Sequence, residues 1–329
     1  MILPPLIYLS ADEIRRALPM TDAIAAVKDA FIALSAKRVD LPHRTRVPLD
    51  ADGLALVMPC ASAEAGAASL KWLSYCPSNP ARDLPVIHAL VILADRATGA
   101  QLGLLEGSAL TVLRTGAASG AASDVLARAD ASTTAIFGAG TQARAQLAAV
   151  LAVRGIRRAR VFDINPLAAE AFALEMTARH GIEVEAAGSP SEALAGADIV
   201  CTTTTATEPV FDDRDLGAGT HINAVGVFDR RYAEIPPETV VRSRVFVDHL
   251  EAALEEAGDL LRPAAAGMIG SDHFRVELGE VLSGRAAGRR GPDEITLFKS
   301  VGSAAQDLFA AVRTVANARR LGLGTKLPR

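Results

Sequence analysis

The sequence predicts an α/β protein in which a doubly wound parallel sheet is joined to a smaller α+β module. Its 329 residues are enough for two domains, since domains typically contain roughly 100–200 residues. From Thr133 onward, apolar runs of strand length alternate with helical segments, which is typical of a parallel sheet covered on both faces. Before Leu105, short β-like runs follow one another directly, and this pattern indicates a separate α+β module.

The chain is expected to open with helices. Ser10 and Glu13 have the spacing of a capping box, and Thr21 precedes a stretch over residues 22–38 in which apolar residues recur at helical spacing. The Ala-rich residues 108–127 contain few helix breakers and predict a connecting helix. Between these helices, β-like runs bounded by turn residues are expected over residues 46–49, 54–58, 69–75, 86–94 and 101–105.

The parallel sheet is expected to take six strands from the second half of the chain. They are predicted over residues 133–137, 159–162, 183–186, 199–203, 221–225 and 244–247. A last helix over residues 302–320 is expected to return to the first module. We therefore expect one domain over residues 1–118, completed by residues 303–329, and a second domain over residues 119–302.

Composition and charge narrow the class of protein. The net charge is −4 and half of the residues are hydrophobic, which argues against a nucleic-acid or polybasic membrane partner. The first residues lack the basic region of a signal peptide and contain two prolines, and no apolar run approaches the roughly 20 residues of a membrane helix. The three cysteines are far apart and have no metal-binding spacing, so disulfides and a metal site are not expected. These features predict a cytoplasmic protein that acts on a small molecule.

A glycine-rich turn follows directly on the predicted strand at 133–137. In a pyrophosphate site, the first glycine makes the tight turn, the second lets the phosphates approach the backbone, and a small third residue allows close helix packing. Gly138, Gly140 and Ala143 meet these requirements, and the N-terminus of the next helix would attract anionic phosphates. The alternative is a flavodoxin-like fold in which the turn only packs. The predicted Rossmann dinucleotide site comprises Gly138, Ala139, Gly140, Thr141 and Gln142.

Asp163 ends the next predicted strand, near the offset of about 20 residues at which such sites carry an acid for the ribose. A carboxylate there would accept hydrogen bonds from the ribose hydroxyls and repel a 2′-phosphate, and Ile164 and Asn165 offer no cation for that phosphate. NAD is therefore favoured as the cofactor, with NADP as the alternative. Asn223 and Val225 end another strand at the edge where doubly wound folds place ligands, so we expect them to contact the cofactor too.

A series of short motifs extends over both predicted domains. They occupy residues 41–45, 70–71, 109–118, 138–143, 196–200, 207–209, 219–226, 247–248, 277–280 and 298–302. Any one of them alone would be a weak signal, but the series in this order is highly specific. On these motifs the whole chain resembles the ornithine cyclodeaminase/mu-crystallin family.

The resemblance implies a homodimer whose subunits pair a Rossmann domain with a substrate and dimerisation domain. It also implies that a basic trio, here Arg44, Lys71 and Arg114, binds the α-carboxylate of the substrate beside the nicotinamide, with Arg46 as a competitor for Arg44. Two guanidiniums and an ammonium can orient a small carboxylate and so place the adjacent carbon for hydride transfer. The alternative for each residue is a solvated charge or an ion pair, the usual state of Arg and Lys.

Members of the family differ in their reactions, so the fold alone does not select one. The cyclodeaminases and the alanine dehydrogenase carry an Asp where this chain has Phe228, and the cyclodeaminase carries a Glu where this chain has Leu56. Without these two carboxylates, the chain resembles the ketimine reductases, which reduce Δ1-pyrroline-2-carboxylate or Δ1-piperideine-2-carboxylate to L-proline or L-pipecolate. The alternatives are an ornithine or lysine cyclodeaminase, an alanine dehydrogenase and a mu-crystallin-like binding protein without turnover.

Lys71 and Asp229 are the candidate catalytic residues. Asp229, His88 or a water could supply the proton that ends on the substrate nitrogen, although Asp229 can equally be a solvent-exposed loop acid. Ser300 matches a family segment near the nicotinamide, and its alternative role is to cap the last helix. The remaining polar residues considered are predicted to be structural, namely His221, His249, Glu106 and Asp248.

Overall fold

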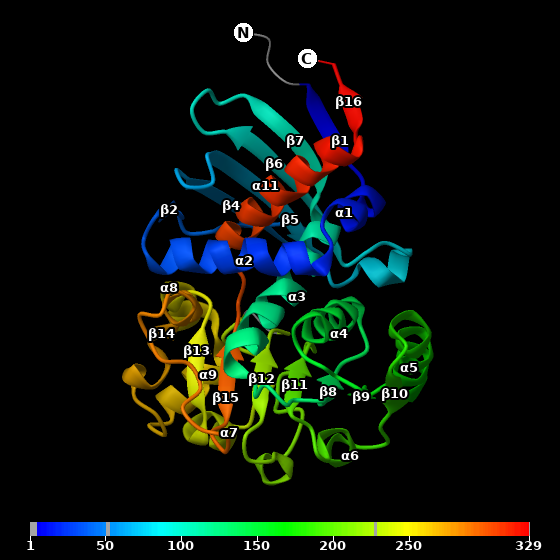
Figure 1. The fold of residues 1–329 in the computed structure, drawn as a ribbon, viewed down its shortest axis with the longest axis vertical. Coiled ribbons are helices and arrows are strands. Elements are labelled where there is room, and N and C mark those ends of the chain that lie inside the picture. The colour runs from blue at the N-terminus through cyan, green and yellow to red at the C-terminus, as the bar shows by residue number, and fades with distance from the viewer. Residues whose placement is uncertain (1–4, 51–52, 227–228, 329) are drawn as a thin grey trace. The chain divides into compact units, whose positions relative to one another are not determined.

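The computed structural model describes residues 5–50, 53–226 and 229–328 (Figure 1). The chain forms two compact units. Unit 1 comprises Met1–Arg114 and Ser303–Arg329, and unit 2 comprises Thr115–Gly302. The sequence-based boundary at residues 118 and 119 lies four residues further along the connecting helix.

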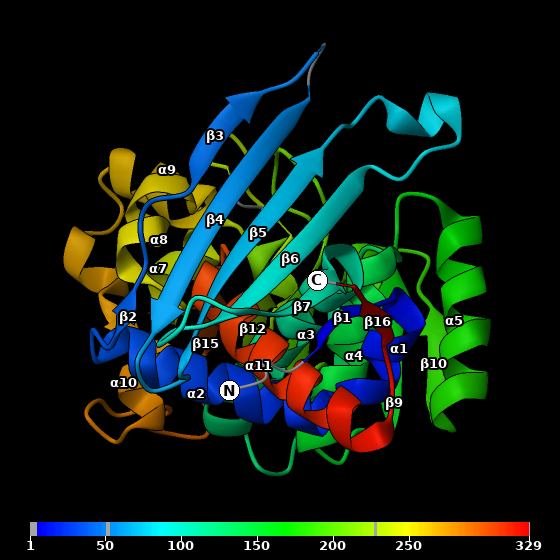
Figure 2. The same cartoon turned by 90° about the horizontal axis from the view of Figure 1, so that it is seen from above.

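Unit 1 contains a sheet that is antiparallel except where β1 pairs with β7 in parallel. Its strand order is β16-β1-β7-β6-β5-β4-β2, and β3 also pairs with β4. Figure 2 shows β3 to β6 as neighbouring strands. The five predicted β-like runs are confirmed: β4, β5 and β7 are longer than predicted, and β3 and β6 are shifted by one residue. Strands β1, β2 and β16 were not foreseen. The strands are β1 Leu6–Leu9, β2 Val39–Asp40, β3 Thr45–Pro48, β4 Leu54–Ser62, β5 Ala67–Tyr75, β6 Ile87–Asp95, β7 Gln101–Glu106 and β16 Thr325–Leu327.

Three helices complete unit 1: α1 Ala11–Ala17, α2 Met20–Ser35 and α11 Ala304–Leu321. Ser10 and Glu13 form the predicted capping box at the start of α1. Helix α2 begins one residue before Thr21, and its N-cap is Pro19, which makes no side-chain cap. Helix α11 packs beside α2 and against β4, β5 and β6 (Figures 1 and 2). The chain's last long helix therefore covers one face of the sheet built by its first hundred residues.

The two faces of this sheet have different environments. Along β5, Ser69, Lys71 and Leu73 are buried, while the alternate residues Leu70 and Trp72 are 38% and 45% exposed. Since successive side chains of a strand point to opposite faces, Lys71 points to the buried face and Trp72 to the other. The exposed face is apolar in these strands, because Leu90, which pairs with Trp72, is also 39% exposed.

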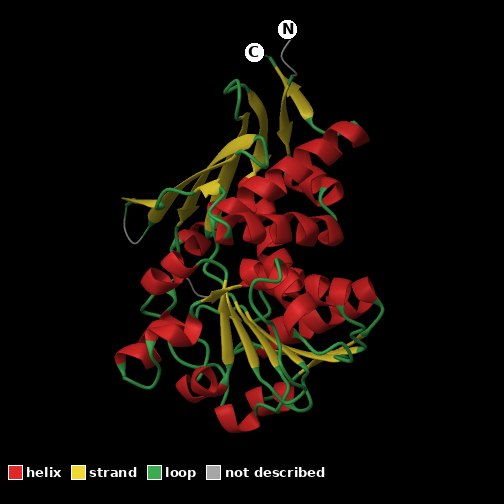
Figure 3. Cartoon of the chain, turned by 60° about the vertical axis from the view of Figure 1, so that its left-hand side comes forward, coloured by secondary structure: helices red, strands yellow, loops and turns green. Residues whose placement is uncertain are grey.

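Unit 2 contains a sheet in which every strand pair is parallel. Its order is β10-β9-β8-β11-β12-β15-β13-β14. Figure 3 shows the yellow strands of this sheet with red helices to either side. All six predicted strands are confirmed, and β14 and β15 were not foreseen. The strands are β8 Thr133–Phe137, β9 Arg158–Phe162, β10 Glu183–Ala186, β11 Ile199–Thr202, β12 His221–Ala224, β13 Arg244–Val247, β14 Val276–Glu277 and β15 Thr296–Lys299.

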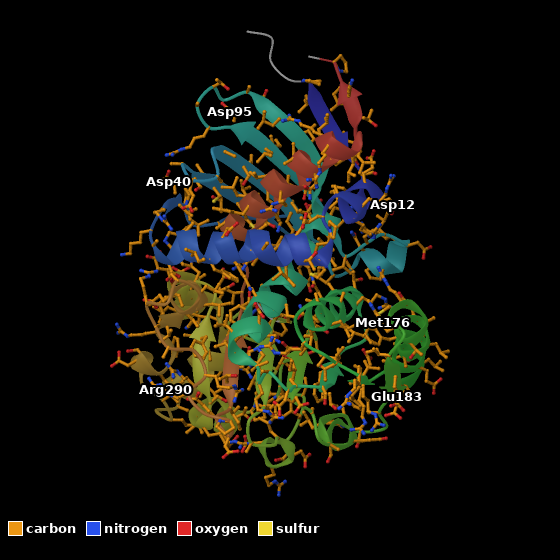
Figure 4. All side chains as sticks on the ribbon, viewed as in Figure 1. Asp12, Asp40, Asp95, Met176, Glu183 and Arg290 are labelled. Atoms are coloured by element: carbon orange, nitrogen blue, oxygen red, sulfur yellow. The ribbon has the colours of Figure 1, made fainter. Side chains whose placement is uncertain are left out.

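Both faces of this parallel sheet are buried. Ala135 and Phe137 of β8 belong to one apolar cluster, whereas Ile136 between them belongs to another. Met176 of α5 is fully buried in the second cluster, whereas Glu183 on the edge strand β10 forms an exposed ion pair with Arg158 at 2.8 Å; both Met176 and Glu183 are labelled in Figure 4. Helix α3 Gly107–Leu126 begins in unit 1 and ends in unit 2. The other helices of unit 2 are α4 Thr141–Val153, α5 Pro166–His180, α6 Pro190–Leu194, α7 Pro237–Arg242, α8 Leu250–Glu256, α9 Gly258–Ala265 and α10 Leu278–Leu282.

The helices and the cysteines were also compared with the sequence expectations. Among the residues that the structure describes, no helix is long and apolar enough to cross a membrane. Cys60 and Cys201 are buried, Cys76 is partly exposed, and all three are free thiols.

Candidate active site

A buried ionic cluster brings together three residues of unit 1 that are far apart in the sequence. Lys71 lies on β5, Arg114 on α3 and Asp307 in the first turns of α11. The Nζ atom of Lys71 donates to both carboxylate oxygens of Asp307 at 3.1 Å, and Nε of Arg114 donates to Oδ1 at 3.1 Å. Lys71 and Asp307 are each 1% exposed and Arg114 is 7% exposed. The sequence prediction thus placed Lys71 and Arg114 at one site, but it did not include their carboxylate partner.

The charges of this cluster perturb one another. Burial lowers the pKa of Lys71 to about 8, Asp307 opposes that change, and Arg114 and Arg44 reinforce it. Burial alone would raise the pKa of Asp307, but Lys71 and Arg114 hold it below its ordinary value. Two cations share one carboxylate, so the three side chains carry a net charge of +1. An unbalanced buried charge is costly, and a small anion such as a carboxylate would balance it.

Arg44 and Arg46 both lie at the start of β3, and they differ in exposure. Arg44 is half-buried just before β3 and lies close enough to Lys71 to affect its pKa. Arg46 is exposed on β3 itself. Arg44 therefore stays the predicted member of the basic trio, with Arg46 as the alternative.

Gln306 is a second partner of the cluster that was not predicted from the sequence. Its Oε1 accepts a hydrogen bond from Nη1 of Arg114 at 2.7 Å, which fixes the orientation of the amide. The side chain is fully buried, and its Nε2 has no hydrogen-bond partner among the described residues. Gln306 and Asp307 form an adjacent polar pair between apolar residues at the start of α11. That pair was the available sequence signal, because buried polar residues of a helix usually have a specific partner.

The glycine-rich turn of unit 2 has the geometry that a dinucleotide requires. Gly138 adopts a φ of +93°, and a Cβ there would lie 2.9 Å from Oγ1 of Thr203. Gly140 is the N-cap of α4 and provides no side-chain cap, and a Cβ built on it meets no atom within 4 Å. The first N–H groups of α4 are therefore available to a ligand. Nearby, Oε1 of Gln142 is buried without a partner among the described residues.

Asp163, which directly follows β9, is hydrogen-bonded to this turn. Its Oδ2 accepts the N–H of Ala139 at 2.7 Å, and its Oδ1 accepts the N–H of Asn165 at 2.8 Å. Each carboxylate oxygen has two lone pairs, so Asp163 can hold the turn and still accept hydrogen bonds from a ribose. Ile164 is 95% exposed beside it. The turn and Asp163 fit a dinucleotide without a 2′-phosphate.

Asn223 and His221 form part of the core of unit 2. Nδ2 of Asn223 donates to Oγ of Ser123 at 3.0 Å, and its Oδ1 lies 3.2 Å from Nε2 of His221. Burial lowers the pKa of His221 to about 3, which keeps the ring neutral. Val225 donates its N–H to the carbonyl of Thr202 at the end of β11. His221 is thus structural, as expected, and the Asn223 side chain is engaged by the core.

Ser300 does not cap the last helix. Its hydroxyl donates to Oδ2 of Asp248 at 2.7 Å, and the same oxygen accepts the N–H groups of Val301 and Gly302. The N-cap of α11 is Ser303. Asp248 therefore has the structural role that the sequence indicated, and the capping role considered for Ser300 is wrong.

The candidate proton donors lie in different environments. Asp229 forms an ion pair with Arg231 of its own loop at 2.9 Å and also accepts the N–H of Arg231. His88 is exposed on β6 and, by strand alternation, points to the face of the sheet opposite Lys71. Leu56 is buried on the same face as Lys71. Phe228, on which the choice of reaction partly depends, lies outside the described residues.

Comparison with known proteins gives matches over nearly the whole chain. The model of the ornithine cyclodeaminase/mu-crystallin family matches residues 7–320. A Δ1-pyrroline-2-carboxylate reductase of Bacillus cereus is 38% identical over 324 residues, which are 98% of this chain and 99% of the relative.

Solved structures give the same picture. The Δ1-pyrroline-2-carboxylate reductase of Thermococcus litoralis, in complex with NADH and L-proline, matches with a TM-score of 0.94 and 40% identity, covering 98% of this chain and 100% of that one. An archaeal alanine dehydrogenase dimer with bound NAD matches with a TM-score of 0.92 and 32% identity, covering 99% of both chains.

Proposed function

This chain belongs to the ornithine cyclodeaminase/mu-crystallin family, and from that premise we propose that it is an NADH-dependent reductase of cyclic imino acids. Its substrate would be Δ1-pyrroline-2-carboxylate or the six-membered Δ1-piperideine-2-carboxylate, and its product L-proline or L-pipecolate. Two of the relatives compared above are Δ1-pyrroline-2-carboxylate reductases, and this resemblance supports the smaller ring as the first substrate to test.

The cluster of Lys71, Arg114 and Asp307 carries the proposal. Its net charge of +1 is buried, and a substrate carboxylate supplies the balancing charge. Arg44 adds a second guanidinium from the start of β3, and the Nε2 of Gln306, which has no partner among the described residues, adds a neutral donor. A carboxylate held by several charge-assisted hydrogen bonds has a fixed orientation, which also fixes the neighbouring C=N carbon.

The cofactor is proposed to bind at the turn made by Gly138, Ala139, Gly140, Thr141 and Gln142. Its pyrophosphate would take the N–H groups at the start of α4, and its adenosine ribose would bind Asp163. NAD is preferred to NADP because the Asp163 carboxylate would repel a 2′-phosphate. Asn223, Val225 and Ser300 are proposed to line the nicotinamide side, with Asn223 contributing through its backbone because its side chain is engaged in the core. When bound, the reduced nicotinamide supplies the hydride that adds to the C=N carbon.

The substrate nitrogen gains a proton in the same reaction. Lys71 is the proposed donor, because its ammonium belongs to the carboxylate clamp and its pKa of about 8 keeps it protonated at neutral pH while making it a stronger acid than an ordinary lysine. Asp229 is the second candidate, and its ion pair with Arg231 would have to rearrange for that role. Lys71 thus combines a binding and a catalytic role.

We propose that the active form is a homodimer joined through the exposed face of the unit 1 sheet. Leu70, Trp72 and Leu90 lie together on that face and expose large apolar side chains. Contiguous apolar surface of this kind typically marks an interaction site. Size-exclusion chromatography with light scattering tests the proposal: a monomer at micromolar concentration would contradict it.

One assay separates the proposed reaction from the alternatives. The purified protein is incubated with NADH and each cyclic imine, and separately with NAD and ornithine, lysine or alanine, while absorbance at 340 nm and ammonia are followed. Loss of NADH only with an imine supports the reductase. Ammonia release from ornithine or lysine without net change in absorbance would identify a cyclodeaminase. NADH formation from alanine would identify an alanine dehydrogenase. Nucleotide binding without any turnover would identify a binding protein.

A further inference from the structure

We propose that Glu234 is a positioning residue for the cofactor, because its buried carboxylate ties together the backbone segments that follow β11 and β12. These segments end at the carboxyl edge of the parallel sheet, where doubly wound folds bind their ligands. The inference deepens the proposed function, since it rests on a nucleotide cofactor binding at that edge. It concerns unit 2 alone.

The Glu234 carboxylate accepts four hydrogen bonds. Its Oε1 receives the N–H of Thr204 at 2.6 Å and the Thr204 hydroxyl at 2.8 Å. Its Oε2 receives the N–H of Gly226 at 2.9 Å and the Thr202 hydroxyl at 3.0 Å. Each oxygen thus holds one backbone N–H, one from the segment after β11 and one from the segment after β12. The side chain is fully buried, so these bonds are not exchanged for bonds to water.

The approach of these segments depends on the absence of a side chain at residue 226. A Cβ on Gly226 would lie 2.4 Å from the carbonyl oxygen of Thr204 and 2.5 Å from Oε1 of Glu234. Two strand ends therefore meet backbone to backbone around one carboxylate. Close backbone approach at the ligand edge of a sheet leaves little freedom for the groups that would line the cofactor, such as Val225.

A second carboxylate holds Glu234 in place. Oδ1 of Asp259 accepts the N–H groups of Glu234 at 2.6 Å and Ile235 at 3.0 Å, and its Oδ2 pairs with Nζ of Lys299 at 2.7 Å. Lys299 ends β15, the strand beside β12. The arrangement therefore joins the carboxyl ends of three neighbouring strands, β11, β12 and β15. In addition, Arg262 of α9 donates to the carbonyl oxygens of two loop residues, Thr207 and Arg231.

Glu234 is buried beside a second carboxylate, which disfavours its ionised form, but only that form can accept all the hydrogen bonds around it. Burial and the neighbouring Asp259 raise the pKa of Glu234 to about 7, while Lys299 and the donors of Thr204 act in the opposite direction. The ionised form can accept all four hydrogen bonds. A protonated form must turn one oxygen into a donor, and a backbone N–H cannot accept from it.

Glu234→Gln is therefore the informative variant. The amide keeps the size of the side chain but has one acceptor oxygen and one NH₂ group. Whichever way it is oriented, its NH₂ group must face the N–H of either Thr204 or Gly226, so one of the two backbone ties is lost. Thr202→Val is a milder second variant, because it removes one hydroxyl donor and leaves both backbone ties.

A matched control is Asp198→Asn. Asp198 also ties backbone within this sheet, since its Oδ2 accepts the N–H groups of Ser132 and Thr133 and its Oδ1 pairs with Arg128. It lies just before β11, so it acts at the opposite, amino edge of the sheet. A variant at this edge is expected to lower stability without changing cofactor binding.

Two readouts test the inference on the full chain. The first readout is the dissociation constant for NADH, which is measured by NADH fluorescence. It is compared with the KM values for NADH and for the imine. We expect Glu234→Gln to raise the dissociation constant tenfold or more and KM for NADH in parallel, with KM for the imine within twofold. Thr202→Val should give a rise of about threefold, and Asp198→Asn none. The second readout is the rate of tryptic cleavage after the exposed Arg230 and Arg231, which should rise in Glu234→Gln and not in Asp198→Asn.

The outcomes separate this inference from the proposed function. Unchanged NADH binding in a folded Glu234→Gln protein, or equal effects of Glu234→Gln and Asp198→Asn, would overturn the positioning role. If Glu234→Gln does not fold, unchanged NADH binding in Thr202→Val would overturn it. If the unaltered protein binds NADH but reduces no imine, the reductase proposal fails and the role of Glu234 is still decided by binding and proteolysis.

Discussion

Replacing Asp307 by asparagine tests the buried cluster that carries the proposed function. The introduced amide would keep the oxygen that accepts from Arg114, but it would place an NH₂ group against the ammonium of Lys71. At the observed N–O distance of 3.1 Å, an effective dielectric constant of about 20 gives an attraction of about 5 kcal/mol between Lys71 and Asp307. That energy corresponds to as much as about four pKa units at about 1.36 kcal/mol per unit. We expect the pKa of Lys71 to fall by at least one unit below its present value of about 8.

The change in pKa has a consequence for activity and another for stability. The carboxylate clamp needs the ammonium form of Lys71, so kcat/KM for the imine should decline above about pH 8 in the unaltered protein. In the variant, this alkaline limb of the pH profile should move to lower pH by at least one unit. Breaking a buried ion pair also costs about 3–5 kcal/mol of stability. Between the lowered pKa and the ordinary value of 10.5, the unfolded chain binds more protons than the folded one, so the free energy of unfolding should rise with pH in that range.

The assay follows kcat/KM and the inhibition constant of cyclopentanecarboxylate across the pH range. This inhibitor has no nitrogen to titrate, and its carboxylate stays ionised above pH ~7, so a change in its binding at higher pH reports the protein. Asp198→Asn serves as the control for the loss of a carboxylate that pairs with an arginine elsewhere, and it should leave this decline at the same pH. A limb that stays at the same pH in a folded Asp307→Asn protein would refute the assignment of Lys71 and Asp307 as one ionic unit.

Three further predictions concern the cofactor turn and the exposed sheet face. Asp163→Ala should reduce the preference for NADH over NADPH by tenfold or more, measured as the ratio of kcat/KM values; an unchanged ratio would remove Asp163 from the ribose site. Gly138→Ala should lower the free energy of unfolding by about 1–3 kcal/mol, because it forces a φ of +93° on a residue with a side chain and brings its Cβ within 2.9 Å of Thr203 Oγ1. Denaturant titration measures this loss, and a stability equal to that of the parent chain would contradict the predicted strain. Trp72→Lys should convert the proposed dimer to a monomer, because it puts a charge into the apolar face, and light scattering that still reports a dimer would place the interface elsewhere.

Features with a local sequence signal were predicted well. The six strands predicted for the parallel sheet were recognisable because apolar runs of strand length recur between helical segments. The turn at Gly138 was recognisable because its spacing satisfies a steric requirement within a few residues. Strand β15 was not foreseen, although Thr296–Lys299 is fully buried. It is a short run directly before a helix, and its place between β12 and β13 depends on pairing and not on its own pattern.

The sequence by itself determined the class of sheet, the glycine-rich turn and the candidate cationic residues, because these depend on local periodicity, on glycine geometry and on family motifs. Only the tertiary structure decided how the charges are balanced. Lys71 and Asp307 are 236 positions apart, and Glu234 reaches Thr202 and Thr204 across 32 and 30 positions. No local pattern encodes such a pairing, since a carboxylate meets its partners only when separate strands and helices pack together and water leaves the space between them.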